Sequence, residues 1–480
     1  MRPIIRLTAR NAAAVLASDV VNRATTFLLY ALVARYLGIF QFGQLSLALT
    51  LFCTFQVVSV AGLKLLIARE VAKDRTRTGT FAVTGSLVVI AASILSFGLL
   101  AVFVRLVQYS PSTKSVILLL GLALLPFSLS AVCEAVFLGW ERMHFIAYAN
   151  LPMNTVKIAV AFLMLHEGYD LYALMILAVV AQTAVVIVEW LLLLRFTIRL
   201  HIRADVPFAL ALIKSATPFL GMDAIIALMA SVNIVLLSRM VGERETGLYN
   251  AATQVLVPVT LLCQSIVLSV FPALCKRFEP SFRQARLISE RLLALLLAIT
   301  LPATVGLLFL SNSVLVFLYG NKGFQSAGMA VRVMAGTIIL TAITSVLGQV
   351  LVAAGRERLT LRIVSIDLLV NFSVGIILIR EFGLIGAALS MLLTKILDAA
   401  QHWMLTYSLF SKPPIARLLW KPIVASACMG GYLLLIQDQR VLTAVVSAGA
   451  LYAVAFLALA VLSTRAWFGF RKTRSGISGI

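Results

Sequence analysis

The hydrophobic positions of this chain form long unbroken runs, unlike the alternating or amphipathic patterns of a soluble fold. Each run extends over about 20 residues or more, the length that a helix needs to cross the hydrocarbon core of a bilayer. Short polar segments separate the runs. The pattern predicts about fourteen transmembrane helices, near residues 11–37, 43–68, 80–108, 115–138, 145–165, 171–196, 215–238, 247–274, 287–310, 327–353, 359–379, 384–409, 418–436 and 441–462.

The overall composition agrees with a chain embedded in lipid. Of the 480 residues, 61% are hydrophobic and 12% are charged, whereas soluble domains contain about 45–50% apolar and about 25% charged residues. A soluble fold could not bury this much apolar surface. The sequence therefore predicts an all-α integral membrane protein and excludes the soluble classes of enzyme and binding protein.

The positive charges follow the predicted helices. The 40 Lys and Arg residues outnumber the 19 Asp and Glu residues, which gives a net charge of +21. In the loops on the N-terminal side of the membrane we count 28 of the 40 cations, against 9 in the opposite loops. Because cytoplasmic loops are rich in Lys and Arg, the pattern predicts a multi-pass plasma-membrane protein (a bacterial inner-membrane protein) with both termini in the cytoplasm. Nucleic acid is not an expected partner.

Residues suited to catalysis or metal binding do not cluster along the chain. The five Cys and four His residues are scattered, and they show neither a disulfide framework nor the spacing of metal ligands. The predicted outer loops are short and carry no paired carboxylates. The sequence predicts a transporter without catalytic residues, bound metal or cofactor.

One turn motif occurs twice. The Arg and two Gly residues of the first interhelical turn recur with the same spacing 204 residues later, as Arg35, Gly38, Gly43 and Arg239, Gly242, Gly247. The same shift places Asp19 on Asp223. This repeat predicts two parallel six-helix lobes around a central cavity, at residues 1–200 and 201–411, followed by two extra helices and a basic cytoplasmic tail at 412–480. A glycine at such a turn adopts left-handed backbone angles at little cost.

These motifs resemble those of polysaccharide-type flippases in the multidrug/oligosaccharidyl-lipid/polysaccharide exporter superfamily. The segments that carry the resemblance are Arg35 with Leu37-Gly38 and Phe42-Gly43, Gly247-Leu248-Tyr249-Asn250-Ala251-Ala252, Phe271-Pro272-Ala273-Leu274 and Gly383-Leu384-Ile385-Gly386-Ala387-Ala388. The resemblance extends over essentially the whole chain. It implies a flippase that moves a polyprenyl-pyrophosphate-linked oligosaccharide across the plasma membrane for O-antigen, capsule or exopolysaccharide synthesis. Glycan polymerase or assembly proteins would be its partners.

Three cations lie well inside predicted helices, away from the helix ends, where an ionised group needs a partner or a wet cavity. We expect Lys157, Arg23 and Lys395 to line a cationic cavity that binds the pyrophosphate. Arg23 is four residues from Asp19 and Lys395 is three residues from Asp398, so each could instead form a local ion pair. Lys157 has no carboxylate within one helical turn, which makes it the best single candidate for binding the pyrophosphate. A structural ion pair with Asp19 or Asp223 of another helix is the alternative.

Three carboxylates are candidates for coupling transport to an ion gradient. Asp19, Asp223 and Asp367 lie inside predicted helices, where a carboxylate could bind Na⁺ or H⁺. We expect coupling to a Na⁺ or H⁺ gradient or to the membrane potential. Glu134 and Glu189 are weaker candidates near helix ends.

Two other functions stay open. A cation-coupled multidrug antiporter of the same superfamily would use Asp19 and Asp223, although the two extra helices and the three buried cations favour the flippase. A membrane-embedded glycan polymerase or glycosyltransferase is the alternative from another class, and it would need acid/base or metal-binding residues in larger outer loops.

Overall fold

In a computed structural model of the chain, the described part comprises residue 22 and residues 24–196, 206–278, 282–410, 415–436 and 441–475. All regular elements in these ranges are helices. Eleven of the described helices are long and apolar enough to cross a membrane. The prediction of an all-α multi-pass membrane protein is therefore confirmed.

The contacts among helices divide the chain into two compact units, Met1–Asn250 and Ala251–Ile480. The predicted lobes at residues 1–200 and 201–411 and the tail region at 412–480 were based on a sequence repeat, which this division does not test. The lobe boundaries and the repeat stay predictions.

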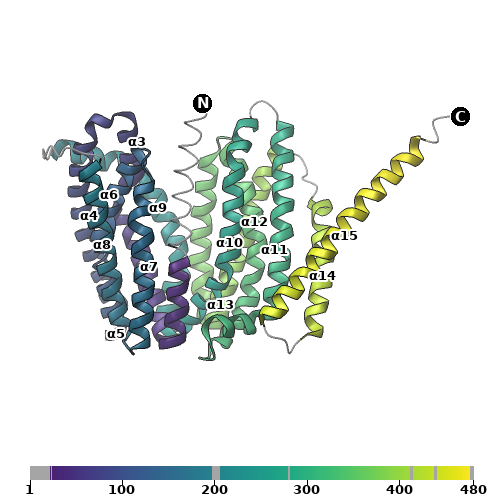
Figure 1. The fold of residues 1–480 in the computed structure, drawn as a ribbon, viewed down its shortest axis with the longest axis horizontal. Helices are drawn as coiled ribbons and strands as arrows, with labels where there is room; N and C mark the ends of the chain where they lie inside the picture. Colours follow the sequence, from purple (N-terminus) through teal and green to yellow (C-terminus); the bar gives the residue numbers. More distant parts are fainter. Residues whose placement is uncertain are drawn as a thin grey trace. The chain divides into compact units, whose positions relative to one another are not determined.

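The first unit is a bundle of long helices with a shorter helix at each end. In Figure 1, α3 lies at one end of this bundle and α5 lies at the other. The described helices are Ala24–Leu37, α2 (Ile39–Val60), α3 (Leu63–Lys73), α4 (Thr78–Val107), α5 (Pro111–Gly121), α6 (Leu124–Gly139), α7 (His144–His166), α8 (Leu171–Phe196) and α9 (Val206–Met240), with a 3₁₀ turn at Arg75–Arg77.

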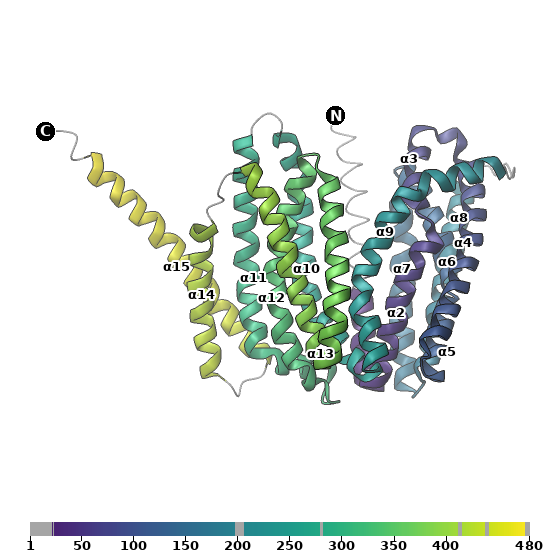
Figure 2. The same ribbon diagram turned by 180° about the vertical axis from the view of Figure 1, so that it is seen from behind.

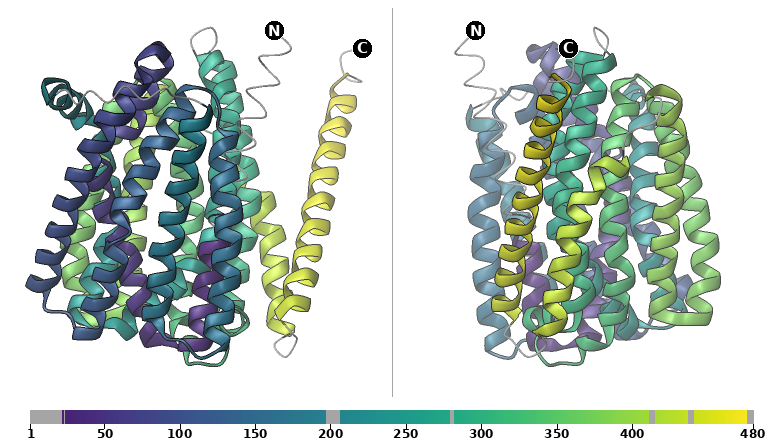
Figure 3. Two further views of the ribbon diagram at one scale, coloured as in Figure 1. Left: turned by 60° about the vertical axis from the view of Figure 1, so that its left-hand side comes forward. Right: turned by 90° about the vertical axis from the view of Figure 1, so that its right-hand side faces the viewer.

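The second unit is also helical. Helix α10 (Glu243–Phe278) begins in the first unit and continues into the second. Its long helices α11, α12 and α13 pack side by side (Figure 2). The last two helices, α14 and α15, contact each other (Figure 3) through Met429, Leu433, Ala444 and Ala448. The bounds are α11 Phe282–Tyr319, α12 Gly328–Ala353, α13 Glu357–Phe410, α14 Ile415–Leu435 and α15 Val441–Ser475, with a 3₁₀ turn at Phe324–Ala327.

The predicted apolar runs match the helices closely, with differences at three places. Helix α13 contains the predicted runs 359–379 and 384–409, which are separated by non-helical Gly383. The run 115–138 is divided between α5 and α6, and the run 43–68 between α2 and α3. The predicted span 115–138 is nevertheless confirmed, because Pro111–Gly139 forms one candidate membrane span. The predicted span 43–68 extends beyond its candidate span, Ile39–Val60. The number of membrane crossings stays a prediction.

The break between α2 and α3 determines where Lys64 lies. Ala61 and Gly62 both have left-handed backbone angles, with φ of 52° and 68°, and these angles end α2. Helix α3 then buries Leu63, Leu66, Ile67 and Val71 in a core shared with α6. Since these residues occupy one face of α3, Lys64 lies beside that face rather than on it.

The duplicated turns have the geometry that their glycines suggested. Gly38 and Gly242 have positive φ, 88° and 120°, which confirms the expected use of glycine. The helices that follow the turns cross closely. A Cβ on Gly43 would collide with the carbonyl oxygen of Glu243, and a Cβ on Gly247 would lie 2.6 Å from the carbonyl oxygen of Ile39.

These two contacts are reciprocal. Gly43 meets Glu243 and Gly247 meets Ile39, and in each copy of the motif the glycine lies four residues after the residue that the other glycine meets. Ile39 and Glu243 are 204 residues apart. Asn250 donates a hydrogen bond to the hydroxyl of Ser46 at 2.7 Å, and these two positions are also separated by 204 residues. Reciprocal contacts of this kind are typical of a two-fold relation between two copies of a motif.

Replacing Gly43 with alanine is expected to lower the melting temperature of the purified protein. The added methyl group would meet backbone atoms of Glu243, and overpacking of this kind costs about 1–3 kcal/mol. Gly98→Ala in α4 is the matched control, because a Cβ there meets no atom within 4 Å. Equal melting temperatures for the two variants would show that the crossing tolerates a side chain.

Candidate functional site

The first unit contains a cavity of about 190 Å³ among α3, α6, α7 and α8. One water molecule needs about 10–15 Å³ of such space, so the cavity can hold several. Half of its 16 lining residues are polar, which is unusual inside so apolar a bundle. The lining residues are Asn22, Lys64, Phe127, Ser130, Ala131, Glu134, Leu138, Ile146, Asn150, Met153, Asn154, Lys157, Ala178, Ala181, Gln182 and Val185.

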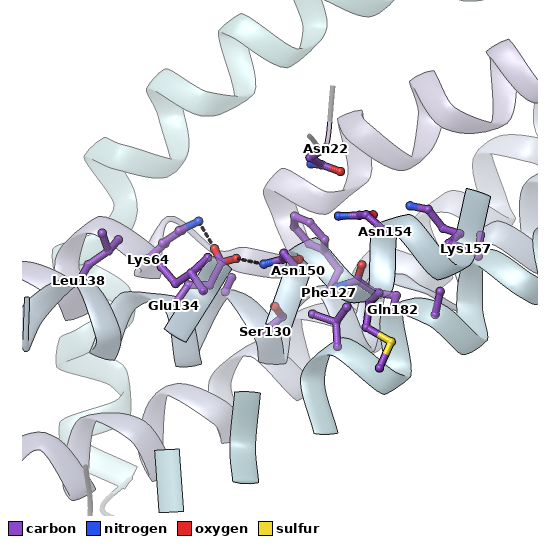
Figure 4. Close-up of a pocket in the computed structure, with 16 residues that line it drawn as sticks. Asn22, Lys64, Phe127, Ser130, Glu134, Leu138, Asn150, Asn154, Lys157 and Gln182 are labelled. Atoms are coloured by element: carbon purple, nitrogen blue, oxygen red, sulfur yellow. Dashed lines mark hydrogen bonds and ion pairs between the residues drawn. The ribbon is translucent and has the colours of Figure 1, made fainter. Parts of the chain in front are cut away.

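Helical spacing aligns the polar side chains along the cavity. Asn150, Asn154 and Lys157 are three or four residues apart, so they lie on one face of α7. Figure 4 shows these three side chains in a row along one side of the cavity. Ser130 and Glu134 are four residues apart and share a face of α6 in the same way. Apolar residues of α6, α7 and α8 also line the cavity, among them Ala131, Met153 and Ala181.

One ion pair at the cavity joins α3 to α6. The ammonium of Lys64 on α3 pairs with Oε2 of Glu134 on α6. The Asn150 amide donates a long hydrogen bond of 3.4 Å to the other carboxylate oxygen, Oε1, and Figure 4 shows both contacts. The Lys64 side chain is 41% exposed, so the protein does not fully enclose it and a ligand in the cavity can reach it.

Two polar groups face the cavity without a protein partner among the described residues. The amide of Asn154 forms no hydrogen bond there, although this residue is only 7% exposed. Lys157 is half-buried and makes no ion pair within the same part of the chain. A buried polar group normally has a hydrogen-bond partner. These two side chains are therefore available to bind water or a polar ligand.

The structure brings one of the three predicted cations to this cavity and places another elsewhere. Lys157 lines the cavity, whereas Arg23 and Asp19 fall outside the described residues. Lys395 belongs to the second unit, where its ammonium lies 2.9 Å from Oδ2 of Asp398. Lys395 therefore forms the local ion pair that the spacing allowed, and its predicted role in binding stays a prediction.

The two described coupling candidates have different surroundings. Asp223 on α9 is exposed and lines a second, mainly apolar cavity of about 470 Å³, which Lys64 also lines. Asp367 on α13 is buried and accepts a hydrogen bond of 2.9 Å from Gln401. It also interacts electrostatically with Lys395 and Asp398. Ion binding by either carboxylate stays a prediction.

Arg35 and Arg239 are exposed at the ends of their helices, next to the duplicated turns. Neither of them lines the 190 Å³ cavity. Their position fits the structural role expected for the turn motif.

Charged and aromatic contacts lie at the end of α3, in the turn that follows it and at the end of α6. Arg75 and Arg142 lie over the ring of Trp140, 5.3 and 5.5 Å from its centroid. Hydrogen bonds from Lys73 and Arg69 lower the pKa of the Glu70 carboxyl, the bond from Lys73 having the larger effect. The hydroxyl and backbone N–H of Thr76 lower the pKa of Asp74. Of these contacts, the one between Arg75 and Trp140 joins the turn after α3 to the end of α6.

Sequence reasoning missed several polar residues of the cavity. Lys64 falls within the predicted run 43–68 and was not singled out, because the break after α2 could not be recognised. Asn150, Asn154 and Gln182 were not singled out. A signal did exist for α7, since Asn150, Asn154 and Lys157 are the polar members of a helical repeat in an otherwise apolar run.

Comparison with known sequences identifies relatives of the chain. The profile of a family described as "Polysaccharide biosynthesis protein" matches residues 8–278, which is more than half of the chain. The "Probable low-salt glycan biosynthesis flippase Agl15" of Haloferax volcanii is 24% identical over 173 residues, 36% of each chain. The "Teichuronic acid biosynthesis protein TuaB" of Bacillus subtilis is 26% identical over 215 residues, 42% of each chain. The matches therefore span less than half of either relative.

Comparison with solved structures shows the fold. The inward closed conformation of the lipid II flippase MurJ has a TM-score of 0.77 and 15% identity, and the match covers 96% of this chain and all of that one. An inward-facing multidrug resistance transporter of the MATE family, in the MOP superfamily, has a TM-score of 0.63 and 13% identity. That match covers 81% of this chain and 95% of the other. The fold is therefore one that transporters of different substrates share.

Proposed function

Since the chain belongs to the polysaccharide biosynthesis protein family, we propose that it is a flippase for a polyprenyl-pyrophosphate-linked oligosaccharide. The substrate would cross the plasma membrane by alternating access and supply surface polysaccharide synthesis. Both termini would lie in the cytoplasm. A Na⁺ or H⁺ gradient or the membrane potential would drive transport, and glycan polymerase or assembly proteins would receive the product.

The cavity of the first unit is the observation that carries this proposal. Lys157 and Lys64 supply two cations and Glu134 supplies one anion, so an anionic headgroup is favoured there. Charge-assisted hydrogen bonds to phosphate oxygens are roughly twice as strong as neutral ones. The amides of Asn154, Asn150 and Gln182 are donors and acceptors suited to sugar hydroxyl groups.

The comparisons support a transporter rather than an enzyme. One relative is named as a glycan biosynthesis flippase, and a lipid II flippase shares the fold. Both names describe a flippase, one for glycan biosynthesis and one for lipid II, which agrees with a cavity suited to pyrophosphate and sugar.

Deletion of the gene, followed by analysis of lipid-linked sugars, tests the proposal. We expect the deletion strain to lose one surface polysaccharide and to accumulate its lipid-linked precursor in the inner leaflet. Expression of the wild-type chain should reverse both effects. A deletion strain with normal surface polysaccharide and no accumulated precursor would contradict the proposed function.

Export of an organic cation is the second candidate, and the position of Asp223 favours it. The 470 Å³ cavity is mainly apolar and contains Lys64 as well as exposed Asp223, so it suits a cation with an apolar body only while the Lys64 ammonium stays paired with Glu134. If this activity exists, Asp223→Asn should abolish resistance to cationic dyes and leave polysaccharide export intact. Unchanged resistance in that variant and in the deletion strain would exclude it.

A further inference from the structure

Glu189 on α8 is a buried carboxylate that the proposed glycan site does not use. It lies seven residues after Gln182 and therefore continues the cavity-facing side of that helix. Its exposure is 0%. The hydroxyl of Ser130 donates a hydrogen bond to Oε2, whereas Oε1 is buried and has no hydrogen-bond partner among the described residues.

The ionisable groups that face Glu189 come from two neighbouring helices. They are Lys64 on α3 and Cys133 and Glu134 on α6. Glu134 and Ser130 are four residues apart on the same face, so the two carboxyl groups are neighbours across the α6–α8 contact. The ammonium of Lys64 pairs with Glu134. Within the part of the chain that the structure describes, Lys64 is thus the cation that neighbours both carboxyl groups.

This arrangement favours one proton on the two carboxyl groups. A buried carboxylate without its own cation is strongly disfavoured in an apolar interior. With Glu189 neutral and Glu134 ionised, the single negative charge is balanced by Lys64. The Oε1 atom of Glu189, which lacks a hydrogen-bond partner among the described residues, then belongs to a neutral carboxyl group.

We propose that Glu134 and Glu189 form a proton-binding site that Lys64 links to the anion in the cavity. The proposal rests on the proposed function, because it needs an anionic headgroup. When a phosphate oxygen engages the Lys64 ammonium, Glu134 loses its cation beside a second carboxyl group, and its ionised form becomes costly. A proton from water then binds Glu134. It returns to water when the headgroup leaves and Lys64 pairs with Glu134 again.

Binding of the headgroup and binding of the proton strengthen each other. Headgroup binding takes up one proton, so a lower pH strengthens binding. Because of this proton, headgroup binding makes the net charge of the site less negative, by one unit, than binding without proton uptake would. Lys157, which has no carboxylate partner among the described residues, adds to the attraction for the anion without exchanging a proton.

The test measures how the dissociation constant depends on pH for the purified full-length chain. The probe is a short-chain polyprenyl-pyrophosphate disaccharide, whose diester pyrophosphate keeps a constant charge through the neutral range. For the wild type, we expect the dissociation constant to fall with falling pH, by up to about tenfold per pH unit for one linked proton. The variant with Glu134→Gln and Glu189→Gln should bind the probe with no pH dependence.

Glu70→Gln is the matched control, because Glu70 lies on α3 but does not line the cavity. It should keep the wild-type slope. A pH-independent wild type, or a double variant that keeps the slope, would overturn the proton site and leave the flippase proposal intact. Absence of binding by the wild type at every pH would instead contradict the proposed function.

A second measurement covers the case in which the double variant does not fold. Titration calorimetry of the wild type in buffers of different ionisation enthalpy counts the protons exchanged on binding. Uptake of one proton per bound probe supports the site, and uptake of none overturns it.

Discussion

Replacing Lys157 with glutamate is expected to reduce glycan export at least about tenfold while the amount of protein in the membrane stays normal. Lys157 makes no ion pair among the described residues, so no such pair is broken. A charge-assisted hydrogen bond contributes about 1.5–3 kcal/mol, and each 1.4 kcal/mol is about tenfold in affinity. The new carboxylate would also repel the headgroup. The measurement is surface polysaccharide per cell, normalised to membrane protein.

Two further variants make this result specific. Lys157→Arg keeps the charge and should keep most of the export. Lys114→Glu makes the same change in charge on α5, away from the cavity, and should export normally. If Lys157→Glu exported as well as Lys114→Glu, Lys157 would have no part in substrate binding.

Replacing Lys64 with glutamate is expected to lower both stability and export. The substitution removes the partner of Glu134 and places a second carboxylate beside it. Breaking a fully buried ion pair costs about 3–5 kcal/mol, and the cost here should be smaller because Lys64 is 41% exposed. The measurements are melting temperature in detergent and surface polysaccharide.

The exchanged variant, with Lys64→Glu and Glu134→Lys, separates these two effects. It re-forms an ion pair and keeps the net charge of the cavity, so the melting temperature should return toward the wild-type value. Export should recover less, because the cation has moved from α3 to α6. If the exchanged variant were as unstable as Lys64→Glu alone, the ion pair would not hold α3 against α6.

Much of the fold could be predicted from hydrophobic runs, because lipid requires long apolar helices. The duplicated turns were also visible, and the expected glycine conformation at Gly38 is confirmed by its positive φ. The break at Ala61–Gly62 could not be recognised, because alanine rarely adopts left-handed angles and the apolar run continues through it.

The candidate site was predictable only in part, because some of its side chains come together only when the helices pack against one another. Lys157 stood out because it lies alone in an apolar run. Lys64 did not, because it reaches the cavity only when α3 folds against α6. The pairing of Lys395 with Asp398 was open at the sequence level, since a spacing of three residues permits a contact but does not require one.

Photo-crosslinking from Met153 tests most directly whether the cavity of the first unit holds the glycan lipid. Met153 lines the cavity on α7, and Leu163 on the same helix is 60% exposed and serves as the control. A photoreactive amino acid at position 153 should form an adduct with radiolabelled lipid-linked glycan in cells, and Lys157→Glu should abolish that adduct. An adduct at position 163 with none at 153 would contradict the account.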